Sequence, residues 1–168
     1  MPPSPWPSVT YQPLGIVHSP FKDPVGMPIQ AMAAPGVAGT LEMDPAYVEG
    51  LRDIDGFSHL IVIYHLHLSR PGSLLVTPFL DTQAHGIFAT RSPQRPNAIG
   101  LSVVRLIRVD GVHLHVEDVD MVDGTPILDL KPYVPQFDNR PAERIGWFAN
   151  NIARVGETRA DRRFAADA

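Results

Sequence analysis

The order of apolar and polar residues along the chain predicts a series of short strands separated by turns. Val37–Met43 alternates between apolar and polar positions, which is the pattern of a strand with one buried face. Phe57–Leu68 is rich in β-branched and aromatic side chains and predicts a buried strand. The apolar segment Tyr11–Val17 predicts the first strand of the domain.

The clearest local signal is a hairpin made of two apolar segments, Leu101–Val109 and Val112–Val119. Asp110-Gly111 between them suits a two-residue turn, because both residues tolerate positive φ. The register expected from that turn pairs Val109 with Val112, Ile107 with Leu114, and Arg105 with Val116. One face of the hairpin is then mostly apolar, as expected when one side meets a core.

Two segments predict helices. Asp44-Pro45 is a favourable start, with Asp44 as the N-cap and Pro45 at the first helical position, and this helix is expected to end near Gly50 to Asp53. In Pro141–Gly156 the apolar residues fall on one helical stripe, and the final glycine suits the stop.

These elements together predict a mainly β fold, an antiparallel β-barrel with a few short helices and one C-terminal helix. We expect a flexible Pro-rich arm over residues 1–10, the barrel domain over residues 11–156, and a polar tail over residues 157–168. A chain of 168 residues is long enough to form one domain with a full hydrophobic core.

The composition excludes several classes of site. The chain has no cysteine, so it cannot contain a disulfide, a thiolate metal centre or a cysteine nucleophile. Its net charge of −4 is mildly unfavourable for a nucleic-acid binder, although a local basic patch is compatible with it. No segment approaches the roughly 18 apolar residues of a membrane span, and the first ten residues lack the pattern of a signal peptide. We therefore expect a cytoplasmic protein.

Two irregular segments are candidates for binding. Ser19–Gly36 contains four prolines and two glycines, so it is expected to be a long loop, either functional or a plain surface connection. Phe88–Gly100, with the sequence FATRSPQRPNAIG, is stiffened by Pro93 and Pro96. We call this second segment the ribbon.

The ribbon carries two arginines and an asparagine. The guanidinium groups of Arg91 and Arg95 suit carboxylates or phosphates, and Asn97 can both donate and accept hydrogen bonds. The alternative is a stiff surface loop whose arginines pair with nearby acids.

A third candidate is the sequence Asp123-Gly124-Thr125-Pro126, which begins a turn before an alternating strand that continues toward Pro135. Its backbone groups, the Thr125 hydroxyl and the Asp123 carboxylate could contact a ligand, or the segment could be an ordinary turn. Lys131 and Tyr133 follow at strand spacing and are expected on one side of the strand.

Histidines offer a different possibility. His59, His65 and His67 share one face of a predicted strand, and His113 and His115 repeat the spacing on the hairpin. Imidazoles at such spacing could bind a divalent metal, although no carboxylate completes a known metal motif. The chain also lacks a GxxxxGK[ST] loop, a GxGxxG turn and a GxSxG elbow.

The segments GIFATRSPQRPNAIGLS and DMVDGTPILDLKPYVP resemble the two signature blocks of the TrmO family, also called TsaA-like or YaeB-like proteins. FSHLIVIYHLH and GIVHSPFKDPVGMPIQ are similar to two further blocks, so the resemblance covers roughly residues 15–135. It implies a β-barrel methyltransferase that uses S-adenosylmethionine and works as a homodimer. The implied reaction is methylation of threonylcarbamoyladenosine beside the tRNA anticodon, on the exocyclic nitrogen of the modified base.

The resemblance also implies site residues. The implied cofactor set is Gln30, His67, Leu68, Arg91, Asp123, Gly124, Thr125 and Pro126. The implied substrate set is Arg95, Asn97, Lys131 and Tyr133. The sequence departs from the family pattern at Gln30-Ala31-Met32, where Gln-Pro-Gly is common, and at His67-Leu68, where His-Gln is common. Longer bacterial members carry a C-terminal domain thought to help engage tRNA, and we expect no counterpart of it after the final predicted helix.

Three expectations about mechanism follow from the resemblance. The DGTP turn and His67 are expected to hold the adenosine part of the cofactor, and Arg91 its carboxylate. The ribbon and the DGTP turn are expected to converge on one cavity. The general base stays open, with Asp123 and a backbone carbonyl as possible proton acceptors. The alternatives are a cofactor-binding barrel with another acceptor and a histidine-ligated metal enzyme.

Overall fold

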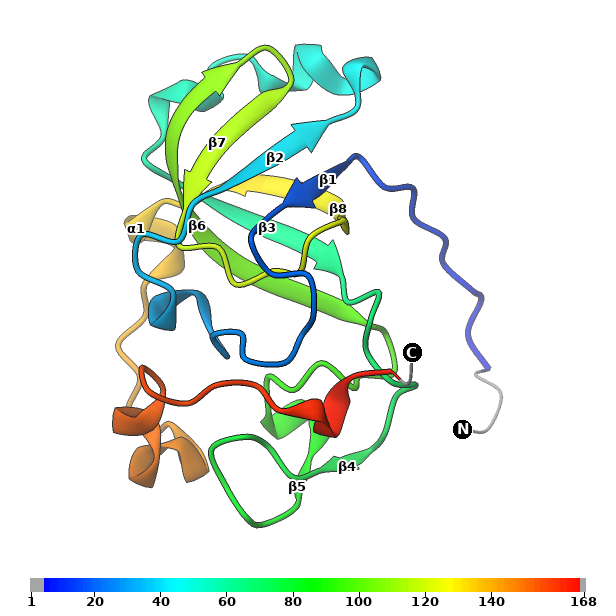
Figure 1. Ribbon diagram of the computed structural model, residues 1–168, viewed down its shortest axis with the longest axis vertical. Helices are drawn as coiled ribbons and strands as arrows, with labels where there is room; N and C mark the ends of the chain where they lie inside the picture. The colour runs from blue at the N-terminus through cyan, green and yellow to red at the C-terminus, as the bar shows by residue number, and fades with distance from the viewer. Residues whose placement is uncertain (1–4, 167–168) are drawn as a thin grey trace.

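The structure is a computed structural model that describes residues 5–166. Six antiparallel strands close into a barrel in the order β1-β2-β7-β6-β3-β8 (Figure 1). These strands are β1 (Gly15–His18), β2 (Gly39–Met43), β3 (His59–His65), β6 (Ile99–Asp110), β7 (His113–Glu117) and β8 (Thr125–Pro132). The mainly β barrel expected from the sequence is confirmed.

Alternate side chains of the barrel strands point into a single hydrophobic core. In β3, the side chains of Leu60, Val62 and Tyr64 are buried, and the residues between them face outward. The core cluster draws on all six strands and on the loop before β8: Val17, Leu41, Met43, Leu60, Val62, Tyr64, Val104, Leu106, Leu114, Val116, Val119, Met121 and Ile127. Closure of the barrel leaves no free edge on its strands.

The β6–β7 hairpin forms, but its register differs from the expected one. Asp110 pairs with His113, so the turn residues are Gly111 and Val112 rather than Asp110 and Gly111. Gly111, with a φ of +59°, supplies the left-handed conformation that the turn requires. The expected pairing of Val109 with Val112 was wrong, because an Asp-Gly pair predicts a turn without fixing which residue opens it.

A bulge in β6 shifts the register again. The pairing changes between Leu106 and Arg108, which leaves Ile107 as the extra residue. Leu106 is buried in the barrel, whereas Ile107 is 48% exposed. The expected pairs of Ile107 with Leu114 and of Arg105 with Val116 were therefore also wrong.

The helical segments are short. The helix expected at Asp44 is the 3-10 helix η2 (Pro45–Leu51), and the Asp44 carboxylate accepts a hydrogen bond from the Ala46 N–H at 2.8 Å. The other helical segments are η1 (Ala31–Ala33), η3 (Ile54–Gly56), η4 (Ile87–Ala89), α1 (Pro135–Asp138), η5 (Gly146–Asn150), η6 (Ile152–Arg154) and η7 (Arg162–Phe164).

The long helix predicted over residues 141–156 is divided into η5 and η6. Gly146, the first residue of η5, has a φ of +59°, so a continuous right-handed helix cannot run through it from residue 141. The apolar residues of the expected stripe consequently have different environments: Val155 is buried, whereas Ile145 and Ile152 are each 46% exposed.

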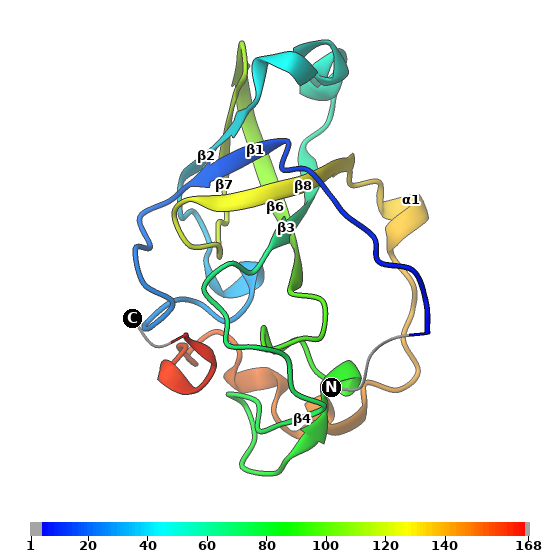
Figure 2. The same cartoon turned by 90° about the vertical axis from the view of Figure 1, so that its right-hand side faces the viewer.

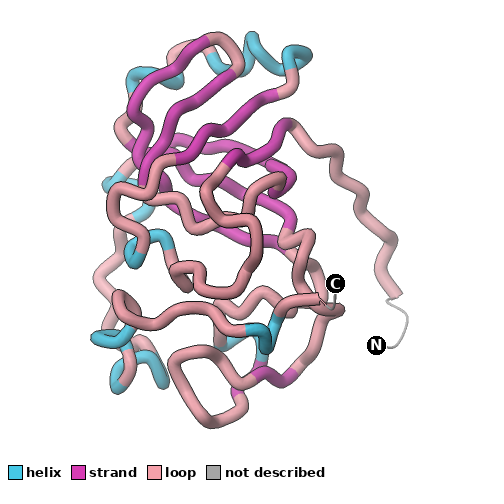
Figure 3. The backbone as a smooth tube through the Cα atoms, in the orientation of Figure 1, coloured by secondary structure: helices cyan, strands magenta, loops and turns pink. Residues whose placement is uncertain are grey.

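A second layer, which is mostly loop, lies beside one end of the barrel (Figures 1 and 3). The barrel and this second layer also occupy separate regions in the turned view (Figure 2). It contains the paired strands β4 (Leu75–Val76) and β5 (His85–Gly86) and two small hydrophobic clusters. Phe164, from the segment expected as a polar tail, is buried in one of these clusters.

Residues 1–4 of the expected Pro-rich arm lie outside the described part of the chain, and residues 5–13 are exposed. Within residues 5–166, no helix has the length and apolar character needed to cross a membrane.

Candidate functional site

The ribbon and the first long loop meet through two of the expected cofactor residues. Arg91 follows η4, and Gln30 immediately precedes η1. The guanidinium of Arg91 donates a hydrogen bond from Nη1 to Oε1 of Gln30 at 3.0 Å. Arg91 is exposed, so much of its donor fork faces solvent. Two residues that are 61 positions apart are thus brought into one place.

Asp120 lies beside the same arginine, and the sequence analysis did not single it out. It accepts a hydrogen bond from the Ser102 hydroxyl at 2.5 Å and another from the backbone N–H of Ala31. Burial raises the pKa of Asp120 to about 6, and the Ser102 hydrogen bond and the charge of Arg91 oppose this rise.

The Ser102 hydroxyl also contacts a buried tyrosine. The Tyr64 hydroxyl lies 3.1 Å from Ser102 Oγ, inside the barrel core. Burial, followed by the nearby charge of Asp120, raises the pKa of Tyr64 far above its usual range. Tyr64 therefore remains protonated and can donate to Ser102 while Ser102 donates to Asp120. This chain of donors fixes the direction of the Asp120 carboxylate.

One signal in the sequence could have identified Asp120. It stands at the head of the block DMVDGTP, between Val119 and Met121, which are both buried. In an extended segment the side chain between two buried residues points the opposite way. Its partners Ala31 and Ser102, however, are known only from the tertiary structure.

The DGTP turn is tied to the loop after β1. The Asp123 carboxylate pairs with Lys22 Nζ at 2.6 Å and accepts the Ser19 N–H at 3.0 Å. The hydrogen bond from Lys22, with that from Ser19, lowers the pKa of Asp123, so this carboxylate stays ionised. It is therefore less suited than Asp120 to accept a proton near neutral pH.

The remaining residues of the turn are held by hydrogen bonds and strand pairing. Gly124 has a φ of +75°, and its N–H donates to the Val17 carbonyl at 2.8 Å. Thr125 is buried, and its hydroxyl donates to the Val122 carbonyl at 2.6 Å. Pro126 pairs with Ile16 of β1. The expected contact of the Thr125 hydroxyl with a ligand stays a prediction, since that hydroxyl is already bonded within the turn.

The turn and the ribbon line different hollows. Asp123 lines one of about 660 Å³ together with His18, Lys22 and Thr40. Gln94 of the ribbon lines another of about 450 Å³. Neither hollow is lined by both segments. The expected convergence of the ribbon and the DGTP turn on one cavity is therefore not seen in these two hollows. The ribbon instead comes near the loop before the turn, where the charge of Arg91 acts on Asp120.

His67 and Leu68 lie just beyond the end of β3. The His67 N–H donates to the His65 carbonyl at 2.9 Å, and burial followed by the neighbouring His65 lowers the pKa of the His67 ring. His67 is therefore neutral at neutral pH. The Leu68 carbonyl accepts the Ala166 N–H at 2.9 Å, so the C-terminal segment runs beside it.

Arg95 holds the ribbon in shape. Its Nη1 donates to the carbonyl of Thr90 at 3.0 Å, with those of Ile87 and Ser92 at 3.3 and 3.4 Å. Asn97 is exposed farther along the ribbon. The assignment of Arg95 to substrate stays a prediction, because this nitrogen is already bonded to the backbone.

Lys131 and Tyr133 lie at the far end of β8 from the DGTP turn. Lys131 is six positions after Thr125 along the extended strand, a distance of about 20 Å. Lys131 Nζ pairs with Asp129 at 2.7 Å, and the Tyr133 hydroxyl donates to Asn139 at 3.0 Å. These two residues therefore lie away from the DGTP turn, and their side chains bond to Asp129 and Asn139.

The histidines do not assemble a metal centre. Among residues 5–166, no three histidine, aspartate or glutamate side chains lie close enough together to hold an ion. The Nδ1 of His115 lies 3.5 Å from the Thr40 hydroxyl.

Comparison with known proteins gives a consistent result. Residues 16–139 match the model of the tRNA-methyltransferase O N-terminal domain. The probable S-adenosyl-L-methionine-binding protein of Pyrococcus abyssi is 53% identical over 156 residues, which are 93% of this chain and 85% of the relative. The tRNA (adenine(37)-N6)-methyltransferase of Escherichia coli is 35% identical over 144 residues, which are 80% of this chain and 61% of the relative.

Crystal structures of TrmO from Pseudomonas aeruginosa match with TM-scores of 0.71 and 0.69, at 36% and 35% identity. The match covers 84% and 83% of this chain. The chain spans 62% of the length of each of these solved chains. The residues around Arg91 and Asp120 fall within the segment that the family model matches.

Proposed function

The chain belongs to the tRNA-methyltransferase O N-terminal domain family, and from this premise we propose that it transfers a methyl group from S-adenosylmethionine to tRNA. The acceptor that we propose is the exocyclic nitrogen of threonylcarbamoyladenosine beside the anticodon. The observation that carries the proposal is the family match over residues 16–139, which includes Gln30, Arg91 and Asp120. A tRNA substrate would place the reaction in the cytoplasm.

The charges near Arg91 fit the proposed cofactor. S-adenosylmethionine has a carboxylate, an ammonium group, a ribose and an adenine ring. The exposed guanidinium of Arg91, oriented by Gln30, can bind the carboxylate through two parallel hydrogen bonds. Asp120 presents the opposite charge beside it, which suits the ammonium group, the ribose hydroxyls or a proton.

The rest of the cofactor set is proposed on the family resemblance. His67 is neutral, which suits contact with an uncharged ring. Leu68 and the turn of Asp123–Pro126 complete the set. The Asp123 oxygens each accept one hydrogen bond already and retain a further lone pair for a ligand hydroxyl.

Asp120 is the proposed general base. S-adenosylmethionine supplies a methyl group from a positively charged sulfur. The sulfur keeps the electrons of the broken S–C bond and leaves as a neutral thioether. Asp120 accepts the proton of the acceptor nitrogen as the new N–C bond forms, and then releases it to water. A pKa of about 6 makes Asp120 a stronger base than an ordinary aspartate while leaving it ionised at pH 7.5.

The substrate residues are proposed to contact the tRNA away from the methylated nucleotide. Lys131 and Tyr133 lie along β8, about 20 Å from the DGTP turn, which a macromolecule can bridge and a small molecule cannot. Arg95 and Asn97 are proposed to act from the ribbon, which Arg95 also stabilises.

We propose a homodimer that forms through the outer face of β3 and β6. Strand register places Ile61 opposite Val103 and Ile63 opposite Leu101, and these side chains alternate with the buried ones. Leu101 is 55% exposed. An apolar sheet face of this kind suits the self-complementary contact of a two-fold dimer.

A methyl-transfer assay tests the proposed function. The purified protein is incubated with S-adenosylmethionine carrying an isotopic label in the methyl group, and with total tRNA from cells that lack the enzyme. Digestion to nucleosides and mass spectrometry should find the label on threonylcarbamoyladenosine. Unmodified tRNA transcript serves as the control and should remain unlabelled.

The outcomes separate the alternatives. Label on a different nucleoside would refute the proposed acceptor and keep the methyltransferase activity. Cofactor binding by calorimetry without transfer to any RNA would favour a binding protein with another acceptor, as the name of the Pyrococcus relative suggests for that protein. Failure to bind S-adenosylmethionine would contradict the whole proposal.

A further inference from the structure

The second layer contains a hollow that the proposed methyl-transfer site does not use. It has a volume of about 450 Å³ and lies between β4, the segment after it, the ribbon and the C-terminal segment. We call it the Gln94 hollow. Its size falls within the range of small-molecule sites, roughly 300–1,000 Å³.

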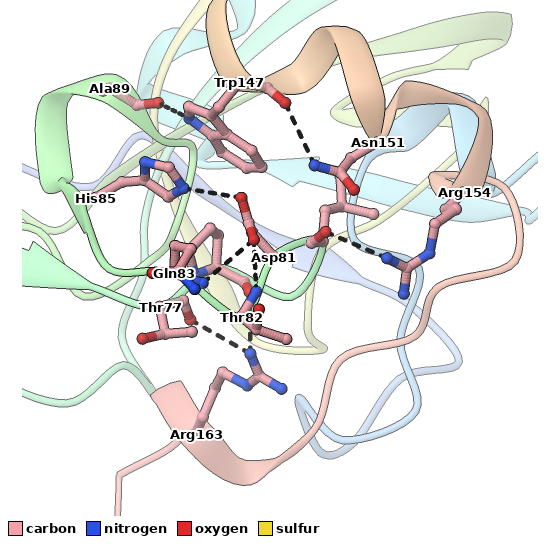
Figure 4. A network of polar contacts seen from close by, with 12 residues as sticks. Thr77, Asp81, Thr82, Gln83, His85, Ala89, Trp147, Asn151, Arg154 and Arg163 are labelled. Atoms are coloured by element: carbon pink, nitrogen blue, oxygen red, sulfur yellow. Dashed lines mark hydrogen bonds and ion pairs between the residues drawn. The ribbon is translucent and has the colours of Figure 1, made fainter.

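Both charged residues of the Gln94 hollow already have partners. Arg163 binds Asp161, with nitrogen–oxygen distances of 2.7 to 2.9 Å. Arg163 also donates to the carbonyls of Thr77 and Pro78 at 3.3 and 3.0 Å, and Figure 4 shows it beside Thr77. A phosphate or a free carboxylate would therefore find no uncompensated cation in Arg163.

Asp81 is satisfied in the same way. Its Oδ2 lies 3.1 Å from His85 Nε2, and its Oδ1 accepts the backbone N–H groups of Thr82 and Gln83 at 2.7 and 3.2 Å (Figure 4). These hydrogen bonds, that of His85 first, lower the pKa of Asp81. The hollow therefore has no strong attraction for a cation either.

An aromatic stack lies next to the hollow but outside its lining. The His85 ring stacks on Trp147 with centroids 4.6 Å apart, and Trp147 stacks on Phe148 at 3.9 Å. The indole N–H of Trp147 donates to the Ala89 carbonyl at 2.8 Å. Because His85 Nε2 lies 3.1 Å from the lining residue Asp81, the stack links one side of the hollow to the segment just before Arg91.

The remaining lining groups are neutral. Thr77, Thr82 and Gln94 carry hydroxyl and amide groups that both donate and accept hydrogen bonds, while Leu75 and Phe164 present apolar surface. Flat apolar faces combined with a polar edge are the chemistry of a nucleobase. Proteins recognise unpaired RNA bases in this way, through apolar contact with the faces and hydrogen bonds to the edges.

Gln94 also connects the hollow to the proposed reaction. It lies three residues after Arg91 in the ribbon, and its carbonyl accepts the Ser73 N–H at 3.1 Å. The Gln94 amide belongs to the hollow and the Arg91 guanidinium to the cluster around Asp120. We infer that the Gln94 hollow binds an unstacked nucleobase that flanks the methylated nucleotide of the RNA substrate. This inference rests on the proposed function.

The test compares RNA binding with cofactor binding in matched variants. Thr77→Val and Gln94→Ala remove hydrogen-bonding groups from the hollow, and Thr10→Val makes the same threonine change on the exposed N-terminal segment. Each is measured with an anticodon stem-loop RNA by fluorescence anisotropy and with S-adenosylmethionine by calorimetry. The two hollow variants should bind the RNA about 3- to 10-fold more weakly, the loss expected for one hydrogen bond. Their cofactor affinity and the behaviour of Thr10→Val should match the wild type.

Abasic RNAs identify the base. Stem-loops that lack one base at a time next to the methylated position are bound by the wild type and by Gln94→Ala. Loss of the bound base should weaken the wild type more than it weakens Gln94→Ala, because the variant already lacks one of the contacts that the base makes. Equal losses in both proteins would overturn the inference, as would weaker cofactor binding by the hollow variants.

If the wild type methylates RNA while the hollow variants bind it normally, the inference fails and the proposed function stands. If the wild type neither binds nor methylates RNA, both fail.

Discussion

A single carboxylate at Asp120 faces three different partners: the Ser102 hydroxyl, the Ala31 N–H and the charge of Arg91. All three favour its ionised form, yet burial dominates and the pKa rises to about 6. The ionised carboxylate therefore costs stability in the folded protein. Such a cost is typical of groups retained for chemistry rather than for the fold.

Two substitutions separate proton transfer from cofactor binding at this site. Asp120→Asn should lower kcat about 10²- to 10⁴-fold, the usual contribution of a general base, and leave the Kd for S-adenosylmethionine nearly unchanged. Arg91→Ala should instead raise the Kd for S-adenosylmethionine, as measured by calorimetry. A large loss of cofactor affinity in Asp120→Asn would mean that Asp120 holds the cofactor instead.

The pH dependence has a definite sign. In the wild type, kcat should rise with pH through about 6, as Asp120 loses its proton, and Asp120→Asn should lack this limb. For stability the direction is reversed. The folded pKa of Asp120 lies above the unfolded value of 3.8, so folding favours the protonated carboxyl. The stability that the protonated carboxyl contributes is present below pH 3.8 and is lost as pH rises through about 6. Asp120→Asn should therefore melt no lower than the wild type at pH 7.5, which excludes unfolding as the cause of lost activity.

At the scale of elements, β3 and β6 pair closely because one position lacks a side chain. Gly100 is the register partner of Tyr64, and a Cβ built at Gly100 would lie 2.2 Å from a carbon of the Tyr64 ring. The ring covers the glycine and brings its hydroxyl within 3.1 Å of Ser102 on the same strand. The pairing of the two strands thus positions the hydrogen-bond chain that reaches Asp120.

Substitution at this glycine tests the pairing. Gly100→Ala should destabilise the protein by about 1–3 kcal/mol, because the methyl group overlaps the Tyr64 ring in a packed core. Gly86→Ala is the control, since no atom lies within 4 Å of its built Cβ and its φ is −59°. Unfolding in urea, followed by circular dichroism, gives both values. Equal stability of the two variants would show that Tyr64 moves aside at no cost.

At the scale of the whole molecule, the barrel has an apolar outer face despite a net charge of −4. The β3–β6 face carries Ile61, Ile63, Leu101 and Val103 in adjacent register positions. Burying this face against a second copy removes apolar area from water, which stabilises the pair by roughly 25 cal/mol per Å².

Sedimentation velocity tests the proposed dimer. The wild type should sediment as a dimer, and Leu101→Glu should sediment as a monomer because it places a charge in the buried face. Val48→Glu makes the same kind of change at a residue of η2 that is 45% exposed, and it should remain dimeric. A dimer that survives Leu101→Glu must use another face.

The sequence by itself determined the barrel. Alternation of apolar and polar residues has the period of a strand, and this alternation can be read within each strand separately. It also determined the N-cap at Asp44, since a cap is a contact between near neighbours. The family blocks marked Arg91 and Gln30 without indicating that they touch.

The tertiary structure alone decided the rest, for reasons of distance along the chain. The contacts of Asp120 with Ala31 and Ser102 join segments that no local pattern relates. The bulge at Ile107 and the left-handed Gly146 were equally hidden, since an apolar residue or a glycine is compatible with several backbone conformations and packing selects one. Local patterns predicted most of the strands, whereas the environment of Asp120 depends on how distant loops pack.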